Sequence, residues 1–201
     1  MYVFRLIAIA ALCAASLPAF AAKPLREAPV SKLPQWHDFS IRQQDALETL
    51  QICEQNEEAC RSADVARWAK LIDDLKTQSR LRQIITVNRW FNRLPYKHDE
   101  YAYDKLDYWA DTAALLEKRG DCEDYALAKY YTLRQLGFRP EELKVTVVYD
   151  SEEYLNHAVL MVYVNGTRYM LDINGDNTDP SPMISRYKTL YTFNENKAWF
   201  Y

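Results

Sequence analysis

Apolar and polar positions change their period near Pro140. Before it, apolar residues recur at the three- and four-residue spacing of amphipathic helices. One face of the segment after Ser62 carries Val65, Trp68, Leu71, Ile72 and Leu75. The pattern predicts helices from Ser40 to about Cys53, from Ser62 to about Thr77, over 80–93, from Asp111 to Lys118, and from Asp121 to Leu136. The tyrosine-rich, charged segment from Tyr96 to Trp109 reads as an irregular loop.

After Pro140 the chain is rich in β-forming residues. The runs 144–149, 157–164 and 167–173 predict strands. Helices followed by strands indicate an α+β domain with an antiparallel sheet, and no internal repeat or flexible linker divides it.

The Asn165-Gly166 pair predicts a two-residue hairpin turn, and this turn fixes a register. Val159 then faces Asp172, and the alternation of side chains puts His157 on the same face. A histidine and an aspartate thus come within side-chain reach. A slip of one residue would separate them, so the pairing is a definite prediction.

The first 21 residues predict a secretory signal peptide. Arg5 precedes an apolar run over 6–16, and Ala19-Phe20-Ala21 offers small residues for cleavage. The alternative, a membrane anchor, is disfavoured because the run is short and ends at Pro18. We expect an extended segment over 22–39, one domain over 40–201, and no stable membrane insertion after cleavage.

Composition narrows the class of protein. The 201 residues are 49% hydrophobic and 26% charged, which suits a globular domain rather than a disordered chain. The net charge is −3, and Lys and Arg are scattered along the sequence, so no cluster of basic residues indicates binding of nucleic acid.

Three cysteines remain after the signal. In an oxidising compartment Cys53 and Cys60 are expected to form a disulfide, with a helix break over 56–59, although two reduced, buried thiols are the alternative. Cys122 is left unpaired. It stands in Gly120-Asp121-Cys122-Glu123-Asp124, at the expected first turn of a helix, where free amides and the helix dipole favour a thiolate. A buried structural cysteine beside ordinary capping acids is the alternative.

Several motifs together resemble the bacterial transglutaminase-like cysteine proteinase family. They are Asp107-Tyr108-Trp109, Gly120 to Ala126, Ala128-Lys129-Tyr130, Leu136-Gly137, His157 to Leu160, Leu171-Asp172, Phe193-Asn194 and Trp199. The resemblance implies a papain- or transglutaminase-like fold, with the N-terminal helices packed on the sheet. It also implies Cys122 as nucleophile, His157 as base and Asp172 as its orienting partner.

The resemblance further implies a periplasmic, calcium-dependent protease. Its substrate would be a large surface adhesin, cut near the N-terminus at an alanine pair to control biofilm attachment and release, and an inner-membrane receptor sensing a cyclic dinucleotide would sequester it. Asp121, Glu123 and Asp124 match the calcium-binding positions, and Ca²⁺ would offset three carboxylates beside a thiolate. Solvated acids without metal are the alternative.

A second metal motif fails. Asp172-x-Asn174-x-Asp176 resembles the start of an EF-hand loop, but Asn177 and Met183 stand where that loop needs Gly and Glu. We expect a loop over 174–182. His37 and His98 are expected at the surface.

Two other functions remain open on the same residues. One is acyl transfer of the transglutaminase or amidase type, and the other is a non-catalytic module that binds a peptide or receptor. The chain departs from the family at Ile173, where Asn is expected, and this leaves the choice of substrate less defined than the triad.

Overall fold

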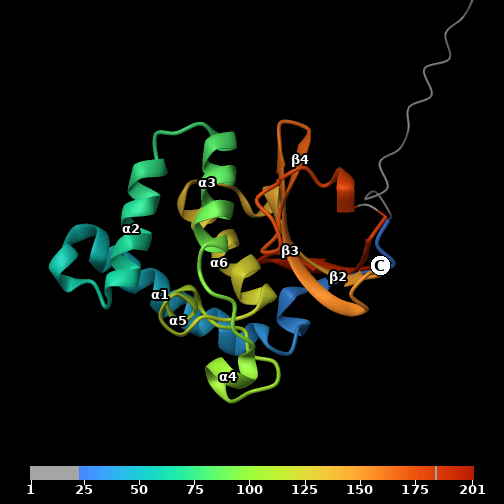
Figure 1. Ribbon diagram of the computed structural model, residues 1–201, viewed down its shortest axis with the longest axis horizontal. Helices are drawn as coiled ribbons and strands as arrows, with labels where there is room; N and C mark the ends of the chain where they lie inside the picture. Colours follow the sequence, from blue (N-terminus) through green and yellow to red (C-terminus); the bar gives the residue numbers. More distant parts are fainter. Residues whose placement is uncertain (1–22, 184) are drawn as a thin grey trace, which may run out of the picture.

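A computed structural model describes residues 23–183 and 185–201 (Figure 1). The predicted signal peptide lies outside the described residues. Within them, no helix is both long and apolar enough to cross a membrane. The helices are α1 (Trp36–Gln55), α2 (Ala63–Leu75), α3 (Arg80–Asn92), α4 (Asp99–Tyr103), α5 (Thr112–Lys118) and α6 (Cys122–Gln135). The strands are β1 (Arg26–Pro29), β2 (Leu143–Asp150), β3 (Leu155–Val164), β4 (Thr167–Leu171), β5 (Tyr187–Phe193) and β6 (Lys197–Phe200).

Helices α2, α3, α5 and α6 form where the pattern predicts them. The side chains of Ser62, Ser79 and Asp111 each accept a hydrogen bond from a main-chain N–H of the first turn, so these residues cap α2, α3 and α5. Helix α6 ends before Gly137, whose φ of +84° is the left-handed conformation that commonly closes a helix.

Two helices differ from the prediction. Helix α1 begins at Trp36 rather than Ser40, because its first turn buries Trp36 and Phe39 in the core. The segment expected to be extended therefore holds β1 and the start of this helix. The segment from Tyr96 to Trp109, expected to be irregular, contains the short helix α4.

The described strands form one six-stranded sheet in the order β1-β6-β5-β2-β3-β4, and every neighbouring pair is antiparallel. The hairpin register is confirmed: Leu160 pairs with Leu171, and Asn165 and Gly166 turn with φ of 52° and 75°. Strands β1, β5 and β6 were not predicted. The sheet is thus wider than the three strand-like runs indicate.

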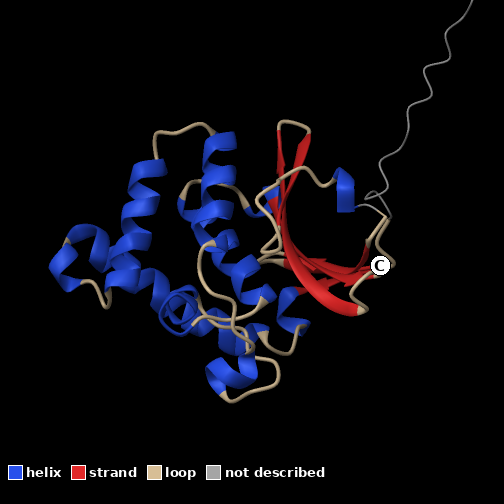
Figure 2. Ribbon diagram, in the orientation of Figure 1, coloured by secondary structure: helices blue, strands red, loops and turns tan. Residues whose placement is uncertain are grey.

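The helices gather on one side of the sheet (Figure 2). Helix α6 lies against β2 and β3, and every residue from Asp124 to Leu133 is buried. The main core joins the helices to alternate residues of β3, including Ala158 and Leu160. Val159 and Met161, which point the other way, join a smaller cluster with Tyr187.

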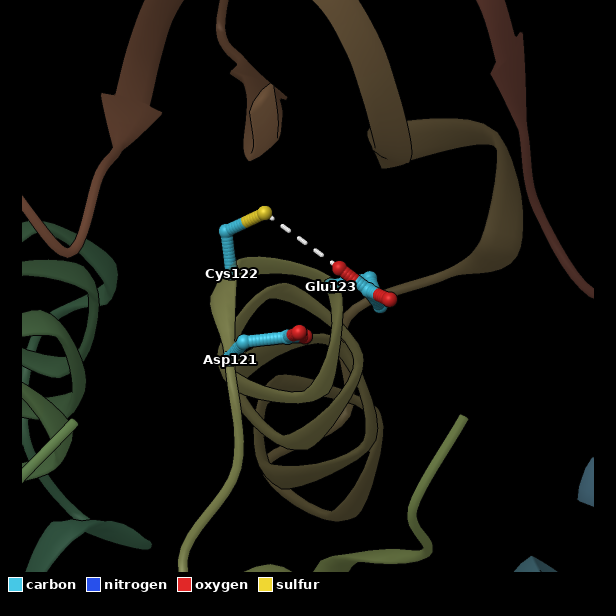
Figure 3. Close-up of side chains that lie close together, drawn as sticks. All are labelled: Asp121, Cys122 and Glu123. Atoms are coloured by element: carbon cyan, nitrogen blue, oxygen red, sulfur yellow. Dashed lines mark hydrogen bonds between the residues drawn. The ribbon is translucent and has the colours of Figure 1, made fainter. Parts of the chain in front are cut away.

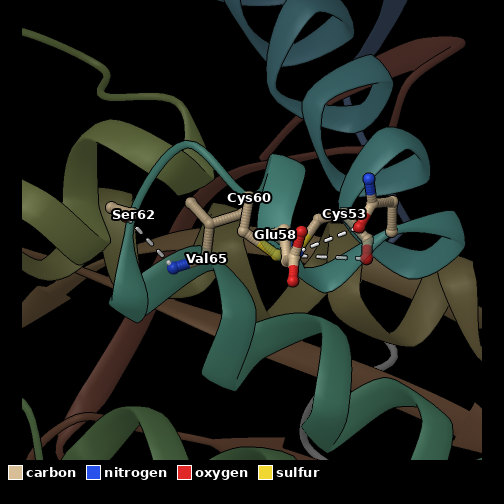
Figure 4. Close-up of a disulfide and its surroundings, with 6 residues drawn as sticks. Cys53, Glu58, Cys60, Ser62 and Val65 are labelled. Carbon is tan, nitrogen blue, oxygen red and sulfur yellow. Dashed lines mark hydrogen bonds between the residues drawn. A yellow bond between two sulfur atoms is a disulfide. The ribbon is translucent and has the colours of Figure 1, made fainter.

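A disulfide joins Cys53 and Cys60 (Figure 4). Helix α1 ends at Gln55, and a short 3-10 turn over Glu57–Ala59 brings the second cysteine back toward the first. The Asn56 side chain accepts a hydrogen bond from the N–H of Glu58 and holds this turn. The predicted helix break is therefore present.

Candidate active site

Cys122 begins α6 at an open edge of the sheet. Strand β4 pairs only with residues 160–164 of β3, which leaves residues 155–159 unpaired on that side. Burial raises the pKa of the Cys122 thiol, and the main chain of Ala158, on this open stretch, is the contact that lowers it and favours the thiolate. The helix start and the strand edge therefore meet at the sulfur atom.

His157 and Asp172 are joined by a hydrogen bond. Nε2 of the histidine lies 2.8 Å from Oδ1 of the aspartate, and both side chains are buried. The N–H of Asn174 donates to the same oxygen at 2.9 Å, and the hydroxyl of Tyr187 donates to Oδ2 at 2.8 Å. The histidine is thus held by an aspartate that is itself held from two sides.

The surroundings of Asp172 keep it ionised. Burial alone would raise its pKa, but the hydrogen bonds from His157, Asn174 and Tyr187 and the charge of the histidine bring the pKa below its usual value. Because Nε2 of His157 is engaged here, Nδ1 is the ring nitrogen left for proton transfer.

Cys122 and His157 line the same cavity, which has a volume of about 190 Å³. Its wall is partly aromatic, and Trp109 stacks on Phe193 with ring centroids 5.1 Å apart. Gln35 and Asp107 close one side through a hydrogen bond of 2.5 Å. Trp109, 5% exposed, therefore both packs in the core and lines the cavity.

The sulfur in this structure is surrounded by acids. Cys122 Sγ lies 3.3 Å from Oε2 of Glu123, and a carboxylate oxygen of Asp121 lies within 4.8 Å of both side chains (Figure 3). Burial raises the pKa of the Cys122 thiol well above its usual value, and the charges of Glu123 and Asp121 raise it further. Without a compensating cation, this site therefore favours a thiol over a thiolate.

The acidic cluster is larger than the sequence indicated. Ligand atoms of Asp99, Asp121 and Asp124 lie within 4.8 Å of one another, as do those of Asp99, Asp107 and Glu123. Burial is the main cause that raises the pKa of Asp99 to about 6 and of Asp121 to about 8, and it also raises the pKa values of Glu123 and Asp124.

Two oxygens of this cluster have no hydrogen-bond partner. Oδ1 of Asp99 and Oδ1 of Asp121 are both buried, although most buried polar atoms in proteins are paired. Carboxylate oxygens are the ligands that Ca²⁺ prefers. The cluster therefore fits a calcium ion, which would pair these oxygens and favour the ionised carboxylates.

Gly120 makes room for Asp124. The buried Asp124 carboxylate accepts hydrogen bonds from the N–H of Ala110 at 2.6 Å and of Asp121 at 3.2 Å. A Cβ atom added to Gly120 would lie 2.0 Å from Oδ2 of this carboxylate. A side chain at position 120 is thus incompatible with the observed place of Asp124.

The structure unites the residues singled out from the sequence and adds others. Cys122 shares a cavity with His157, and Asp121, Glu123 and Asp124 fall in the acidic cluster. Tyr187, Asp99 and Asp107 were missed. A signal existed only for Asp107, which opens the Asp-Tyr-Trp motif. His37 and His98 lie at the surface as expected, and residues 174–180 form a loop that a 3-10 turn over Ser181–Met183 follows.

The chain resembles known proteins in its sequence and in its fold. The sequence model described as bacterial transglutaminase-like cysteine proteinase matches residues 42–199. Calcium-bound LapG of Legionella pneumophila superposes with a TM-score of 0.65 at 27% identity, over 77% of this chain and 87% of LapG. The EGTA-treated form superposes with a TM-score of 0.64 at 25% identity, over 77% and 84%. No curated protein sequence matches the chain.

Proposed function

Because the chain belongs to the bacterial transglutaminase-like cysteine proteinase family, we propose that it is a calcium-dependent cysteine endopeptidase with Cys122, His157 and Asp172 as its triad. The observation that carries this proposal is the His157–Asp172 hydrogen bond beside a cavity that both His157 and Cys122 line. The family match over residues 42–199 supports a catalytic domain over 40–201, to which strand β1 and the first turn of α1 add the residues before it.

The first half of the reaction forms an acyl-enzyme. Nδ1 of His157 takes the proton of the Cys122 thiol, and the sulfur attacks the peptide carbonyl carbon to give a tetrahedral intermediate. When this intermediate collapses, the carbon–nitrogen bond breaks and the histidine returns the proton to the leaving amine. In the second half, the histidine takes a proton from water, whose oxygen attacks the thioester carbonyl carbon. The carbon–sulfur bond then breaks, the carboxylic acid leaves, and the histidine returns the proton to the sulfur.

Asp172 and Tyr187 act on the histidine rather than on the substrate. The aspartate fixes the imidazole ring through Nε2 and stabilises the imidazolium that forms when the thiol gives up its proton. The Tyr187 hydroxyl and the Asn174 N–H keep this aspartate ionised and correctly oriented. Ile173 follows the aspartate directly, and the asparagine one position later supplies this N–H donor.

Calcium would be held by Asp99, Asp121, Glu123 and Asp124, with Asp107 at the edge of the cluster. When bound, the ion supplies positive charge beside the nucleophile, which lowers the cost of forming a thiolate among these carboxylates. The buried, unpaired oxygens of Asp99 and Asp121 support this proposal. The calcium-bound and EGTA-treated forms of the similar LapG also support it.

The substrate and the location follow from the family resemblance. We infer that the chain is exported to the periplasm by the signal peptide over 1–21 and cuts a large surface adhesin near its N-terminus at an alanine pair. Biofilm attachment and release would then depend on this cleavage, and an inner-membrane receptor that senses a cyclic dinucleotide would sequester the protease. A cavity of about 190 Å³ with Trp109, Tyr191 and Phe193 in its wall suits short side chains at the scissile bond.

The experiment that tests the proposal separates hydrolysis from acyl transfer. The mature chain is incubated with calcium, an adhesin segment containing an alanine pair, and an excess of a primary amine. The masses of the products are then measured by mass spectrometry. A protease gives two fragments whose masses sum to that of the substrate plus water. Fragments that carry the amine, or a glutamine side chain joined to it, would show a transferase instead. No reaction of any kind would favour a binding module.

A further inference from the structure

A lysine is buried beneath the proposed triad. Lys129 lies on α6, about two helical turns after Cys122, and is 1% exposed. Its amino group donates hydrogen bonds to Oδ1 of Asn88 at 2.8 Å and to Oδ1 of Asn92 at 2.7 Å, both from α3. A buried amine is costly unless it is paired, so this arrangement requires an explanation beyond packing.

The two asparagines that bind Lys129 also donate hydrogen bonds to the loop after β4. Nδ2 of Asn92 donates to the carbonyl oxygen of Asp172 at 2.9 Å and to that of Gly175 at 3.0 Å. Nδ2 of Asn88 donates to the same Gly175 oxygen at 3.0 Å, and Nδ2 of Asn92 also reaches Asp176 Oδ1 at 3.2 Å. The network therefore ends on the main chain of the proposed catalytic aspartate.

Lys129 fixes the orientation of the side-chain amides of Asn88 and Asn92. A lysine amino group that donates to an amide must face its oxygen, and the NH₂ end must then face the opposite way. Burial lowers the pKa of Lys129 to about 7, while the carboxylates of Asp172 and Asp176 favour the charged form. Either form of the amine can donate two hydrogen bonds, so the amides keep their orientation in both.

We propose that Lys129 is a positioning residue for Asp172, holding residues 172–176 through Asn88 and Asn92 so that the aspartate meets His157. This inference rests on the proposed function, because it takes the triad as the site of chemistry. It ties the helix that carries Cys122 to the loop that carries the aspartate. The same loop contains Asn174, whose N–H binds the Asp172 carboxylate at 2.9 Å.

The test uses the reactivity of Cys122 and needs no substrate. The rate constant for alkylation of Cys122 by iodoacetamide is measured by mass spectrometry on the calcium-loaded chain. Cys122 is the free cysteine within the described residues, and the mass of the peptide that contains it is followed, which keeps its alkylation separate from that of Cys13. Four proteins are compared: the unmodified chain, Lys129→Met, Asp172→Ala, and the double variant. Lys70→Met, which removes an exposed lysine from α2, is the matched control.

Lys129→Met is expected to slow alkylation about 10-fold, because a misplaced aspartate supports the imidazolium less well. In the Asp172→Ala background the same change is expected to have almost no further effect, since Lys129 acts through that aspartate. An unchanged rate in Lys129→Met, or an equal loss in both backgrounds, would overturn the proposal. Lys70→Met is expected to react like the unmodified chain.

Asn92→Asp keeps the proposal testable if Lys129→Met does not fold. Aspartate keeps an oxygen for Lys129 but removes the NH₂ donor to the carbonyl of Asp172. A comparable slowing is expected, and a normal rate would contradict the proposal. A chain that cleaves no peptide but whose alkylation depends on Lys129 would refute only the endopeptidase. A chain that cleaves peptides normally with Lys129→Met would refute only the positioning role.

Discussion

Nε2 of His157 lies 2.8 Å from Oδ1 of Asp172, although strand β4 ends one residue before the aspartate. The register set by the Asn165-Gly166 turn carries the two residues to one face of the hairpin. The 172–176 loop then keeps the carboxylate in place through main-chain hydrogen bonds. The strand register thus brings the two side chains together, and the contacts of the loop hold the aspartate in place.

Tyr187→Phe is expected to lower kcat with little change in KM. The variant removes the hydroxyl that donates to Asp172 Oδ2 at 2.8 Å and keeps the ring. A hydrogen bond to a charged group contributes about 1.5 to 3 kcal/mol, so a loss of roughly 10-fold or more in kcat follows. Tyr154→Phe, at an exposed position, is the matched control. A normal kcat in Tyr187→Phe would show that the hydroxyl is dispensable.

Gly120→Ala is expected to destabilise the chain and weaken calcium binding. The added Cβ would lie 2.0 Å from Asp124 Oδ2, so the buried carboxylate must move. A clash of this kind costs about 2 kcal/mol or more in the free energy of unfolding, which denaturant titration measures. Gly175→Ala is the control, because a Cβ there meets nothing within 4 Å. Equal stability of the two variants would contradict the close approach.

Calcium is expected to raise the melting temperature and the cleavage rate, and EGTA is expected to reverse both. At a calcium concentration 100 times Kd, binding adds about 2.7 kcal/mol to the free energy of unfolding. Asp99→Asn, which alters an unpaired buried oxygen of the cluster, should reduce this shift. Asp104→Asn, at an exposed position in the same segment, should not. If EGTA leaves both the rate and the melting temperature unchanged, the calcium site is wrong.

Much of the fold follows from local patterns. Helices α2 and α3 carry a regular apolar face and a serine cap, so their positions could be predicted. Strand β5 could not, because a bulge opposite Val147 and Val148 interrupts the alternation of its side chains. Strands β1 and β6 have only four residues each and exist through pairing with one another and with β5. Such pairing between distant segments leaves little local signal.

In the candidate site, too, some residues could be predicted from local sequence patterns and others could not. Cys122, His157 and Asp172 could be singled out because a helix start and a hairpin turn are local features. Tyr187 and Asp99 come from segments without a recognisable motif, and only tertiary packing brings them to the triad and to the acidic cluster. The sequence therefore revealed the reacting groups better than the residues that support them.

Asp150→Asn is expected to destabilise the chain at neutral pH but not in strong acid. Hydrogen bonds from Arg186 lower the pKa of Asp150 to about 2, from a value near 3.9 in the unfolded chain. The ionised form therefore stabilises the fold above about pH 4, and this contribution is lost as the pH falls from about 4 to 2. Urea titrations should show a difference of about 1 to 2 kcal/mol at pH 7 that shrinks toward pH 2. A difference that stays constant with pH would contradict this assignment.

The most direct test of the central claim is cleavage by Cys122→Ala. The variant removes the sulfur and leaves the buried contacts of α6 in place, so its circular dichroism and its melting temperature with calcium should match those of the unmodified chain. We expect no cleavage of an adhesin segment with an alanine pair, under conditions in which the unmodified chain cuts it fully. Cleavage at an undiminished rate would contradict the assignment of Cys122 as the nucleophile.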